Sequence, residues 1–566
     1  MRLLSVMLMA LVCVPVFAVD YIQPKPLQEV VKTPVATVKS GQQQLPIISW
    51  GADMATIYAN GNSQKSTPQS LFAAAGLDFN LAREDVFATQ LSNYLSGQTP
   101  YLRGTMGMLN MAADLLNKDI RTKPVVIFKL SDSAGGDALV VKDSIRTVAD
   151  LKGKTIVLQA YGPHVDYLTR ILQDAGMSVK DVNLRWVADL TGTNNSPAAA
   201  LRTKEIDAAF VITPDALALT SNGAVGTGSE DSVKGARILL STKTANKVIV
   251  DVYAVRSDYL QQQPAQVQAF VGTLLKAQEQ VATLVAQRNQ QKQDYNSFLR
   301  ASARLLLDAE TATADAEGLY QDAALALFNG NKAFFSSSND LRRFSVIAEE
   351  SLAGVKALQM ATGAMSLTAN NWNYELLRTG IGAVKSVESV RFNENAAAAV
   401  VSRKQQQGSL AEGELYSFEV YFAPNQNAFS ADLYKEAFDK VINLASTYGG
   451  ALITVEGHTD PMGYLRQKKA DENALVLGRV KQSAKNLSFS RAQSVRSEII
   501  AYANTKGLAL DSSQFVTVGH GIALPKTGIC GDEPCAPKTE QEWRSNMRVV
   551  FRIIQVEAEA DVFKPL

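Results

Sequence analysis

The sequence predicts an α/β fold over residues 46–400, followed by a smaller α+β module over residues 415–566. In the first region, apolar runs of strand length alternate with helical patterns, which is typical of parallel sheets with helices on both faces. After residue 415 the pattern changes, because Phe418, Val420 and Phe422 alternate with other residue types as in a half-buried strand. At roughly 100–200 residues per domain, a chain of 566 residues predicts about three folding units.

Each region contains recognisable elements. Residues 155–159 predict the clearest strand, and Gly162-Pro163 opens a helix with its apolar side chains on one face. The later elements of the α/β region are a strand at 182–187, a short helix at 197–203, a strand at 206–212 and a mostly helical stretch at 265–400. Residues 401–414, which include Lys404-Gln405-Gln406-Gln407-Gly408, are predicted to be a linker. The α+β module has, in order, a helix capped by Ser430, a strand at 452–455, a helix that ends near Gly507 and strands at 515–518 and 549–553.

Composition narrows the functional class. The chain has 56 Lys and Arg against 55 Asp and Glu, whereas nucleic-acid-binding proteins usually carry a basic excess or a basic face. The hydrophobic fraction of 46% is ordinary for a globular protein. Only three His and three Cys occur, and none has the spacing of a zinc or haem site. We therefore expect no nucleic-acid partner, no metal and no cofactor.

The N-terminus predicts export to the periplasm. A positive start, an apolar run and the Val16-Phe17-Ala18 site make a signal peptide over residues 1–18, cleaved after Ala18. A membrane anchor is the alternative, but the apolar run is about fifteen residues, short of the ~20 that span a bilayer. Lipidation of Cys13 is disfavoured, because no small residue stands immediately before it. Residues 19–45 are predicted to be a flexible leader.

Two cysteines remain after that cleavage, Cys530 and Cys535. An even pair in an oxidising compartment predicts a disulfide that closes a small loop. A redox centre fits the spacing less well, because such centres more often have Cys-x-x-Cys.

Enzyme signatures do not emerge from the sequence. Gly153-Lys154-Thr155 resembles the end of a phosphate-binding loop, but Val148 stands where a Gly is required, and a strand follows instead of a helix. No Gly-x-Ser-x-Gly elbow occurs, and His164, His458 and His520 have no evident nucleophile partner. We expect a binding protein and not an enzyme.

Four ordered blocks in the C-terminal module carry a resemblance to a known domain. They are Glu456-Gly457-His458-Thr459-Asp460-Pro461, Leu487-Ser488-Phe489-Ser490-Arg491-Ala492, Val518-Gly519-His520-Gly521 and Asn546-Met547-Arg548-Val549. The module resembles the OmpA-like domain, which implies non-covalent binding to peptidoglycan at the diaminopimelate of the stem peptide. By position, the resemblance implies that Asp460 and Arg491 form the binding pair, and Thr459 and Asn425 are assigned to the same site.

The chemistry of this pair suits such a ligand. The side-chain end of diaminopimelate has an ammonium and a carboxylate on one carbon, so an Asp can accept from the first and an Arg can pair with the second. We expect Arg491 in the first turn of its helix, where free N–H groups also favour an anion. The alternative is an ordinary salt bridge between Asp460 and Arg491 that orders the fold.

Two features depart from the OmpA-like pattern. Met547 stands where the domain usually has an Arg, and an insertion lengthens the chain between Asp460 and Leu487. The insertion carries the basic residues Arg466, Lys468, Lys469, Arg479, Lys481 and Lys485. These side chains could contact anionic wall or lipid groups, but a charge run is usually a solvated face, which is the interpretation that we prefer.

Several stretches of the α/β region carry a second resemblance. They are Ile48-Ser49-Trp50-Gly51, Gly135-Gly136-Asp137-Ala138-Leu139-Val140-Val141, Thr147-Val148-Ala149-Asp150-Leu151-Lys152-Gly153-Lys154, Tyr161-Gly162-Pro163-His164 and Glu205-Ile206-Asp207-Ala208-Ala209-Phe210. The region resembles periplasmic solute-binding proteins of the nitrate, sulfonate and thiamine-precursor transport type. This implies two α/β lobes, joined by crossing segments, that close on a ligand like a hinge.

Ligands of such folds lie at the carboxyl ends of strands and at helix N-termini. These positions select the candidate ligand residues Ser49, Trp50, Asp53, Thr105, Ser133, Gly135, Asp137, Tyr161, His164 and Asp215. Hydroxyls and exposed N–H groups suit a small polar or anionic solute, and Trp50 and Tyr161 could form an apolar or cation–π wall. Structural roles are equally consistent with the sequence, with Trp50 in the core and His164 as a helix cap.

Together the two resemblances imply a periplasmic solute-binding protein tethered to peptidoglycan, with association to the outer membrane also open. The first hypothesis is capture of a small solute for an inner-membrane ABC transporter. The alternative is a cell-wall-associated structural or sensory protein whose α/β lobes bind a partner protein. A wall-acting enzyme is a weaker third option, because no catalytic constellation is evident.

Overall fold

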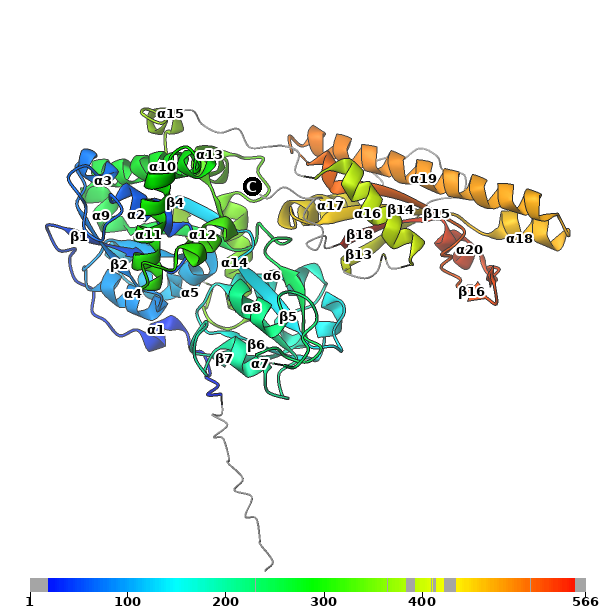
Figure 1. Cartoon of the computed structure of the whole chain (residues 1–566), viewed down its shortest axis with the longest axis horizontal. Coiled ribbons are helices and arrows are strands. Elements are labelled where there is room, and N and C mark those ends of the chain that lie inside the picture. Colours follow the sequence, from blue (N-terminus) through cyan, green and yellow to red (C-terminus); the bar gives the residue numbers. More distant parts are fainter. Residues whose placement is uncertain are drawn as a thin grey trace, which may run out of the picture.

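The computed structural model describes residues 19–229, 231–363, 365–382, 392–408, 410, 414–421, 434–508 and 510–554 (Figure 1). The predicted signal peptide over residues 1–18 and the candidate residue Asn425 lie outside these ranges. The described chain is a mixed α/β protein with two five-stranded sheets, a four-stranded sheet and two two-stranded ones. The prediction of a mixed α/β architecture is therefore confirmed. Each helix in the described ranges is too short or too polar to cross a membrane.

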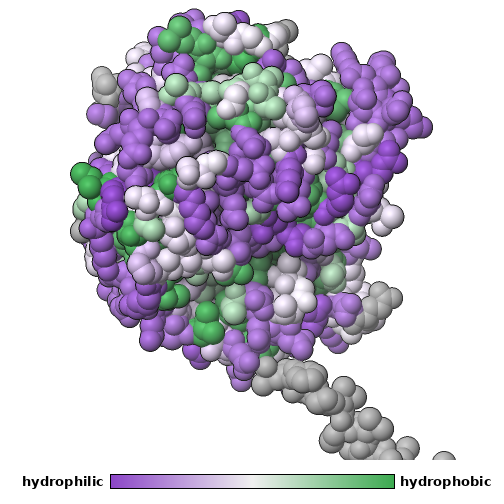
Figure 2. All heavy atoms as spheres, turned by 90° about the vertical axis from the view of Figure 1, so that its left-hand side faces the viewer, coloured by the Kyte–Doolittle hydropathy of each residue, from purple (hydrophilic) through white to green (hydrophobic). Residues whose placement is uncertain are grey.

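Lobe 1 is formed by two separate stretches of the chain. Its elements are β1 (Gln43–Ile47), α2 (Asp53–Ala59), α3 (Leu71–Ala74), β2 (Phe79–Arg83), α4 (Phe87–Leu95), β3 (Tyr101–Thr105), α5 (Met106–Leu116), β4 (Pro124–Ser133), β10 (Val250–Arg256), α9 (Ser257–Gln262), α10 (Pro264–Ala286), α11 (Lys292–Leu307), α12 (Thr313–Asp322), β11 (Ala323–Leu325), α13 (Leu327–Ser336), α14 (Phe344–Ala357), β12 (Thr368–Ala369) and α15 (Tyr374–Leu377). The sheet order is β11-β4-β10-β3, with β10 antiparallel to both neighbours. Phe128, Tyr253 and Phe270 are among the buried side chains that join this sheet to α10. The outer face of the lobe is mostly hydrophilic, with small separate hydrophobic patches (Figure 2).

Lobe 2 lies between those two stretches in the sequence. Its elements are β5 (Asp137–Val141), β6 (Thr155–Gln159), α6 (His164–Asp174), β7 (Asn183–Val187), α7 (Pro197–Leu201), β8 (Ala208–Ile212), α8 (Thr213–Leu219) and β9 (Arg237–Ser241). The sheet order is β7-β6-β8-β5-β9, with β6 parallel to β7 and β8. Phe210 and Val211 are consecutive residues of β8 and belong to different core clusters, so both faces of this sheet are covered. The crossing segments between the lobes are residues 134–136 and 242–249.

The C-terminal unit is a four-stranded sheet with helices against it. Its elements are α16 (Glu394–Gln406), β13 (Glu414–Tyr421), α17 (Lys435–Thr447), β14 (Leu452–His458), α18 (Met462–Lys469), α19 (Ala474–Thr505), β15 (Phe515–Gly521), β16 (Ile529–Cys530), β17 (Glu533–Pro534), α20 (Glu540–Asn546) and β18 (Arg548–Ile554). The sheet order is β13-β18-β14-β15, and β14 and β15 are parallel. Helix α19 crosses β14 and β15 with Ala492, Val495 and Ile499 buried. Its N-terminal half extends past the sheet together with α18 (Figure 1).

A buried arginine joins the C-terminal unit to the lobes. Arg170 of α6 donates to Asn443 Oδ1 and Thr447 Oγ1 of α17, at 2.7 and 3.1 Å. The same guanidinium pairs with Glu350 of α14 at 2.7 Å. Around it, one apolar core runs through lobe 1, lobe 2 and the C-terminal unit. The described units therefore pack as one continuous body.

The predicted flexible leader lies along both lobes, so that prediction is wrong for residues 19–45. The amide of Ile22 donates to the carbonyl of Trp186 in lobe 2, at 2.9 Å. Leu27, in the short helix α1 (Leu27–Val30), is fully buried, and the amide of Ala36 donates to Leu95 O of lobe 1 at 2.9 Å. An extended segment held at scattered points has no periodic apolar face, which is why its sequence resembles a flexible tail.

The predicted linker at 401–414 is partly helical, because α16 continues to Gln406. Val400 and Val401 are buried beside Val518 of β15, so this helix belongs to the C-terminal core. The Lys- and Gln-rich run concealed the helix, although both residue types are good helix formers.

A close approach at Gly450 makes the contact between the C-terminal unit and the second crossing segment testable. Its amide donates to Thr244 O at 3.1 Å, and an added Cβ would lie 1.8 Å from the carbonyl oxygen of Lys243. We expect Gly450→Ala to cost about 1–3 kcal/mol and to separate the C-terminal unit from the second crossing segment, which small-angle X-ray scattering would record as a larger radius of gyration. Gly463→Ala in α18 is the control, since no atom lies within 4 Å of the Cβ that it adds. An unchanged scattering curve for Gly450→Ala would contradict the contact.

Candidate functional site

The crossing segments bring four of the predicted ligand residues together. Ser133 donates to Asp137 Oδ2 at 2.6 Å, and His164 Nε2 lies 2.8 Å from Asp137 Oδ1. The amide of Gly135 donates to Thr242 Oγ1 at 3.0 Å, and this hydroxyl is 2.9 Å from Ser133 Oγ. The side chains of Ser133, Asp137, His164 and Thr242 are all buried. They therefore bond one another across the lobe junction, and His164 Nδ1 is left buried without a hydrogen-bond partner.

Asp53 belongs to a buried ion-pair cluster in lobe 1. Arg103 of β3 is fully buried between Asp53, at 2.8 Å, and Asp251, at 2.7 Å. Burial raises the pKa of Asp53 to about 6, and the adjacent Arg103 opposes the rise. Arg103 was not singled out in the sequence, because the partners of an Arg inside an apolar strand come from distant elements. The geometry makes Asp53 a structural partner of Arg103.

Trp50 packs inside the junction. Its Nε1 donates to Ser131 Oγ at 3.0 Å, and Ser131 donates to Asp251 Oδ2 at 3.2 Å. Its ring fills the space above Gly136, where an added Cβ would come within 2.4 Å of the indole. Trp50 is partly buried and packs against the lobe 1 core, which is close to the core role that the sequence left open for it. Ser49, next to it, is exposed and donates to Asp85 Oδ2 at 2.9 Å.

Tyr161 and Asp215 lie at helix starts in lobe 2, outside the crossing cluster. Tyr161 has a φ of +62°. Its hydroxyl binds the N-terminal segment that was predicted to be a flexible leader: it accepts from the Lys25 amide at 2.8 Å and donates to Lys25 O at 2.7 Å. Asp215 is in the first turn of α8, and burial raises the pKa of its carboxyl. Its Oδ2 is buried without a hydrogen-bond partner.

Thr105 caps α5, and beside it lies a carboxylate that the sequence did not single out. Thr105 Oγ1 accepts from the Met108 amide at 3.2 Å. Asp166 of α6, in lobe 2, accepts from the Gly107 amide at 2.8 Å in the first turn of α5. Burial raises the pKa of Asp166 to about 6, with the hydrogen bonds from Gly107, Ser351 and Thr105 opposing the rise. In the sequence, Asp166 looks like an ordinary acid at the start of its own helix.

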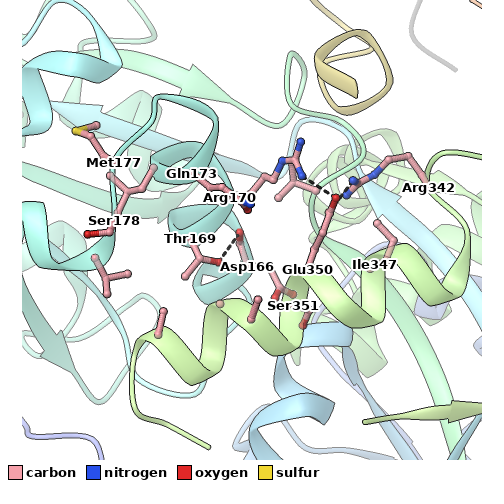
Figure 3. A pocket seen from close by; sticks show the side chains of 16 residues that line it. Asp166, Thr169, Arg170, Gln173, Met177, Ser178, Arg342, Ile347, Glu350 and Ser351 are labelled. Carbon is pink, nitrogen blue, oxygen red and sulfur yellow. Dashed lines mark hydrogen bonds and ion pairs between the residues drawn. The ribbon is translucent and has the colours of Figure 1, made fainter. Parts of the chain in front are cut away.

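A cavity of about 200 Å³ lies between α6, α14 and the second crossing segment (Figure 3). Leu172, Val248 and Ile347 are among its apolar lining side chains. Its polar lining includes Asp166, Arg170, Arg342, Glu350 and Ser351. Glu350 receives both arginines, at 2.7 Å each, so this part of the lining is already paired.

The predicted wall-binding residues lie at the end of β14, among buried polar atoms without partners. Asp460 Oδ2 accepts from the Met462 amide at 2.9 Å, whereas Oδ1 has no hydrogen bond of normal geometry. Thr459 Oγ1 and Nε of Arg491 are also buried and unpartnered, whereas His458 lies beside the backbone of Leu524 and Asp460 beside the side chains of Trp543 and Asn546. Burial raises the pKa of Asp460 and lowers that of Arg491. No ion pair joins Asp460 to Arg491 among the described residues, so they are not the ordinary salt bridge that the sequence left open.

The predicted place of Arg491 in its helix is wrong. Helix α19 begins at Ala474, capped by Asn473, so Arg491 lies well inside it and its amide is used within the helix. The basic insertion supplies α18 and the first turns of α19, which extends the helix backwards from the predicted start. A ligand carboxylate at Arg491 would therefore be bound by the guanidinium alone, because no free backbone N–H groups of α19 lie at this position. The six basic side chains of the insertion are exposed, as expected of a solvated face.

Parallel pairing of β14 with β15 produces a cluster that the sequence spacing did not predict. Glu456, His458 and His520 place one possible metal-ligand atom each within 4.8 Å of the others. The His rings stack at 4.8 Å, and His520 Nε2 lies 3.0 Å from Glu456 Oε2. Glu456 Oε1 accepts from Arg552 at 2.9 Å, and burial, reinforced by nearby Arg548, lowers the pKa of His458 to about 2. A cation would face both arginines, so we interpret the cluster as a neutral polar core.

Cys530 and Cys535 form a disulfide, with their Cα atoms 5.0 Å apart. Glu533, inside this loop, accepts from the hydroxyl of Tyr464 at 3.1 Å and also bonds Lys468. The loop therefore packs against α18.

One family model matches part of the chain. Residues 69–283 match the family model described as NMT1/THI5 like. That range includes both crossing segments, all of lobe 2 and part of lobe 1. No curated protein sequence matches the chain.

Three solved structures illustrate what the fold is similar to. The periplasmic sulfonate-binding protein SsuA from Methylobacillus flagellatus is 16% identical, with a TM-score of 0.40, over 63% of this chain and 99% of that one. The periplasmic aliphatic sulphonate-binding protein SsuA from Escherichia coli is 14% identical, with a TM-score of 0.40, over 62% and 94%. The desulfurization enzyme DSZB is 16% identical, with a TM-score of 0.34, over 59% and 96%.

The raised pKa of Asp166 predicts a pH-dependent stability. Its carboxyl titrates near pH 6 in the folded chain and near 3.8 when unfolded, so its contribution is fully present below pH 3.8 and is lost as the pH rises through 6. Relative to the wild type, Asp166→Asn should therefore gain up to about 3 kcal/mol in free energy of unfolding between pH 4 and pH 8. Urea unfolding of both proteins across this range would measure it. A constant difference between them would contradict the buried, ionisable Asp166.

Proposed function

We propose that this chain is a periplasmic solute-binding protein that captures a small polar or anionic solute for an ABC transporter and is tethered to peptidoglycan by its C-terminal unit. The observation that carries the first half is the NMT1/THI5-like match across the lobe junction. Two of the similar solved structures are periplasmic sulfonate-binding proteins, which agrees with it. The disulfide Cys530–Cys535 is consistent with an oxidising compartment.

The lobe junction is the proposed place of solute capture. Asp137 and His164 come from lobe 2, whereas Ser133 ends a strand of lobe 1, so a hinge motion would separate these groups and free their hydrogen bonds. Thr105 at the start of α5 and Ser49 and Asp215 at the rims would then be additional contacts. Hydroxyls, amides and one imidazole suit a solute with several hydrogen-bonding atoms.

The unpartnered polar cluster at the end of β14 supports the wall tether. Buried polar groups are normally hydrogen-bonded, yet Thr459 Oγ1, Asp460 Oδ1 and Arg491 Nε each lack a hydrogen bond of normal geometry. A zwitterionic diaminopimelate end would supply an ammonium for Asp460 and a carboxylate for Arg491. The OmpA-like sequence blocks coincide with these same residues.

A thermal-shift screen of the full chain tests solute capture. We expect a saturable rise in melting temperature with at least one member of a panel of small anions, sulfonates, amino acids and pyrimidines. A solute at 100 times its Kd adds about 2.7 kcal/mol to the folded state. A flat response to the whole panel would argue against solute binding.

Wall binding is tested by sedimentation with isolated sacculi. Asp460→Ala and Arg491→Ala should each weaken retention by about 10–100-fold, since loss of a charge-assisted contact costs about 1.5–3 kcal/mol. Glu472→Ala and Arg479→Ala are matched controls, because both residues are exposed on the α18–α19 extension. Full retention of both site variants would remove Asp460 and Arg491 from the proposal.

One observation favours the second candidate, a wall-associated protein whose lobes bind a partner protein. The junction groups bond each other, and an apolar core continues from lobe 1 into lobe 2. A junction that never opens would leave the outer faces of the lobes as the functional surface. A solute that raises the melting temperature and also changes the scattering curve of the chain would argue against this alternative.

A further inference from the structure

The N-terminus of α5 in lobe 1 is occupied by a carboxylate from lobe 2. Asp166 Oδ2 accepts the Gly107 amide at 2.8 Å, and the hydroxyl of Thr105 also lies beside this carboxylate. Gly107 is required for this approach, because a Cβ there would stand 2.3 Å from Asp166 Oδ1. The chain thus builds a pocket for one carboxylate group at the first turn of an eleven-residue helix.

The carboxylate of Asp166 is held as a bound anion would be, but its hydrogen bonding is incomplete. The residue is 7% exposed, and its Oδ1 has no hydrogen bond of normal geometry. Among the described residues, no Lys or Arg forms an ion pair with it. The nearest guanidinium on the same helix, Arg170, is already paired with Asp174 and Glu350. The Gly107 amide, the dipole of α5 and the hydroxyls of Thr105 and Ser351 stabilise the charge in place of a cation.

We propose that the N-terminus of α5 is an anion subsite and that Asp166 is its internal occupant, which an anionic solute displaces. This inference rests on the proposed solute-binding function and deepens it by assigning the solute an anionic group. A carboxylate, sulfonate or phosphate oxygen would take the Gly107 amide and the Thr105 hydroxyl. A neutral solute could not replace the charge that the helix terminus favours.

The cavity beside Asp166 gives such a solute access and space. It measures about 200 Å³, is partly open to solvent and has Asp166 and Ser351 in its lining. Figure 3 shows Asp166 between α6 and α14, next to Ser351. An anionic group that enters from the cavity reaches the α5 terminus once the Asp166 side chain has turned away. The apolar lining by Leu172 and Ile347 could then cover the remainder of a small organic anion.

The test compares anion binding by the full chain and three variants. Asp166→Ala vacates the subsite, Asp166→Asn keeps the shape without the charge, and Asp143→Asn makes the same charge change at an exposed site in lobe 2. The probes are sodium sulfate and sodium butanoate, titrated by calorimetry against sodium chloride of equal ionic strength. We expect both Asp166 variants to bind at least one probe at least tenfold more tightly than the wild type and Asp143→Asn do.

A second variant shows where the probe binds. Gly107→Ala added to Asp166→Ala places a Cβ in the vacated subsite without the clash, and it should abolish the gain in affinity. Equal or weaker binding by both Asp166 variants, or a gain that survives Gly107→Ala, would overturn the inference. If the wild type binds a solute of the wider panel while the Asp166 variants gain no anion affinity, the proposed function stands and this inference fails. If the variants bind an anion tightly while the wild type binds no solute at all, the subsite stands and the proposed function fails.

Discussion

The buried guanidinium of Arg170 is the interaction on which the arrangement of the three parts depends. It pairs with Asp174 in its own helix at 2.8 Å, with Glu350 of α14, and with the Asn443–Thr447 end of α17. Because α14 also packs against α5, one side chain links lobe 2 both to lobe 1 and to the C-terminal unit. Removing one partner of a buried pair costs about 3–5 kcal/mol, since it strands the other charge. Any lobe motion must therefore break these contacts or carry the C-terminal unit along.

The lobes are held closed by the chain's own groups. Ser133, Asp137 and His164 bond one another, Asp166 occupies the α5 terminus, and residues 22–36 run across both lobes. Under the proposed function, a solute would compete with all of these contacts, and its apparent affinity would be reduced by the fraction of molecules in which they are open. Such a protein responds only to a solute whose own contacts exceed those that it replaces. The same constraint links solute binding to the C-terminal unit, because both meet at α6.

The sequence predicted elements better than it predicted contacts. Strand β6 has the predicted bounds, because a buried apolar run between Gly-rich turns leaves few alternatives. Ser133, Asp137 and His164 were selected because they lie at strand ends and at the start of a helix, and the structure brings their side chains together. Arg103 and Asp166 were missed because their partners lie in other elements, and a single sequence does not show such pairs. Arg491 was misplaced because the insertion before it consists of good helix formers that continue the helix.

Native mass spectrometry of the chain recovered from cell walls tests the central claim most directly, namely that one molecule holds a solute and the wall at once. Sacculi would be isolated without detergent from cells that export the chain, digested with a muramidase, and the released protein weighed natively and after denaturation. We expect the native mass to exceed the denatured mass by a muropeptide and by a small anion. The muropeptide alone should be lost in Asp460→Ala protein recovered from the soluble fraction. Recovery of the wild-type chain only from the soluble fraction, at the denatured mass, would contradict the account.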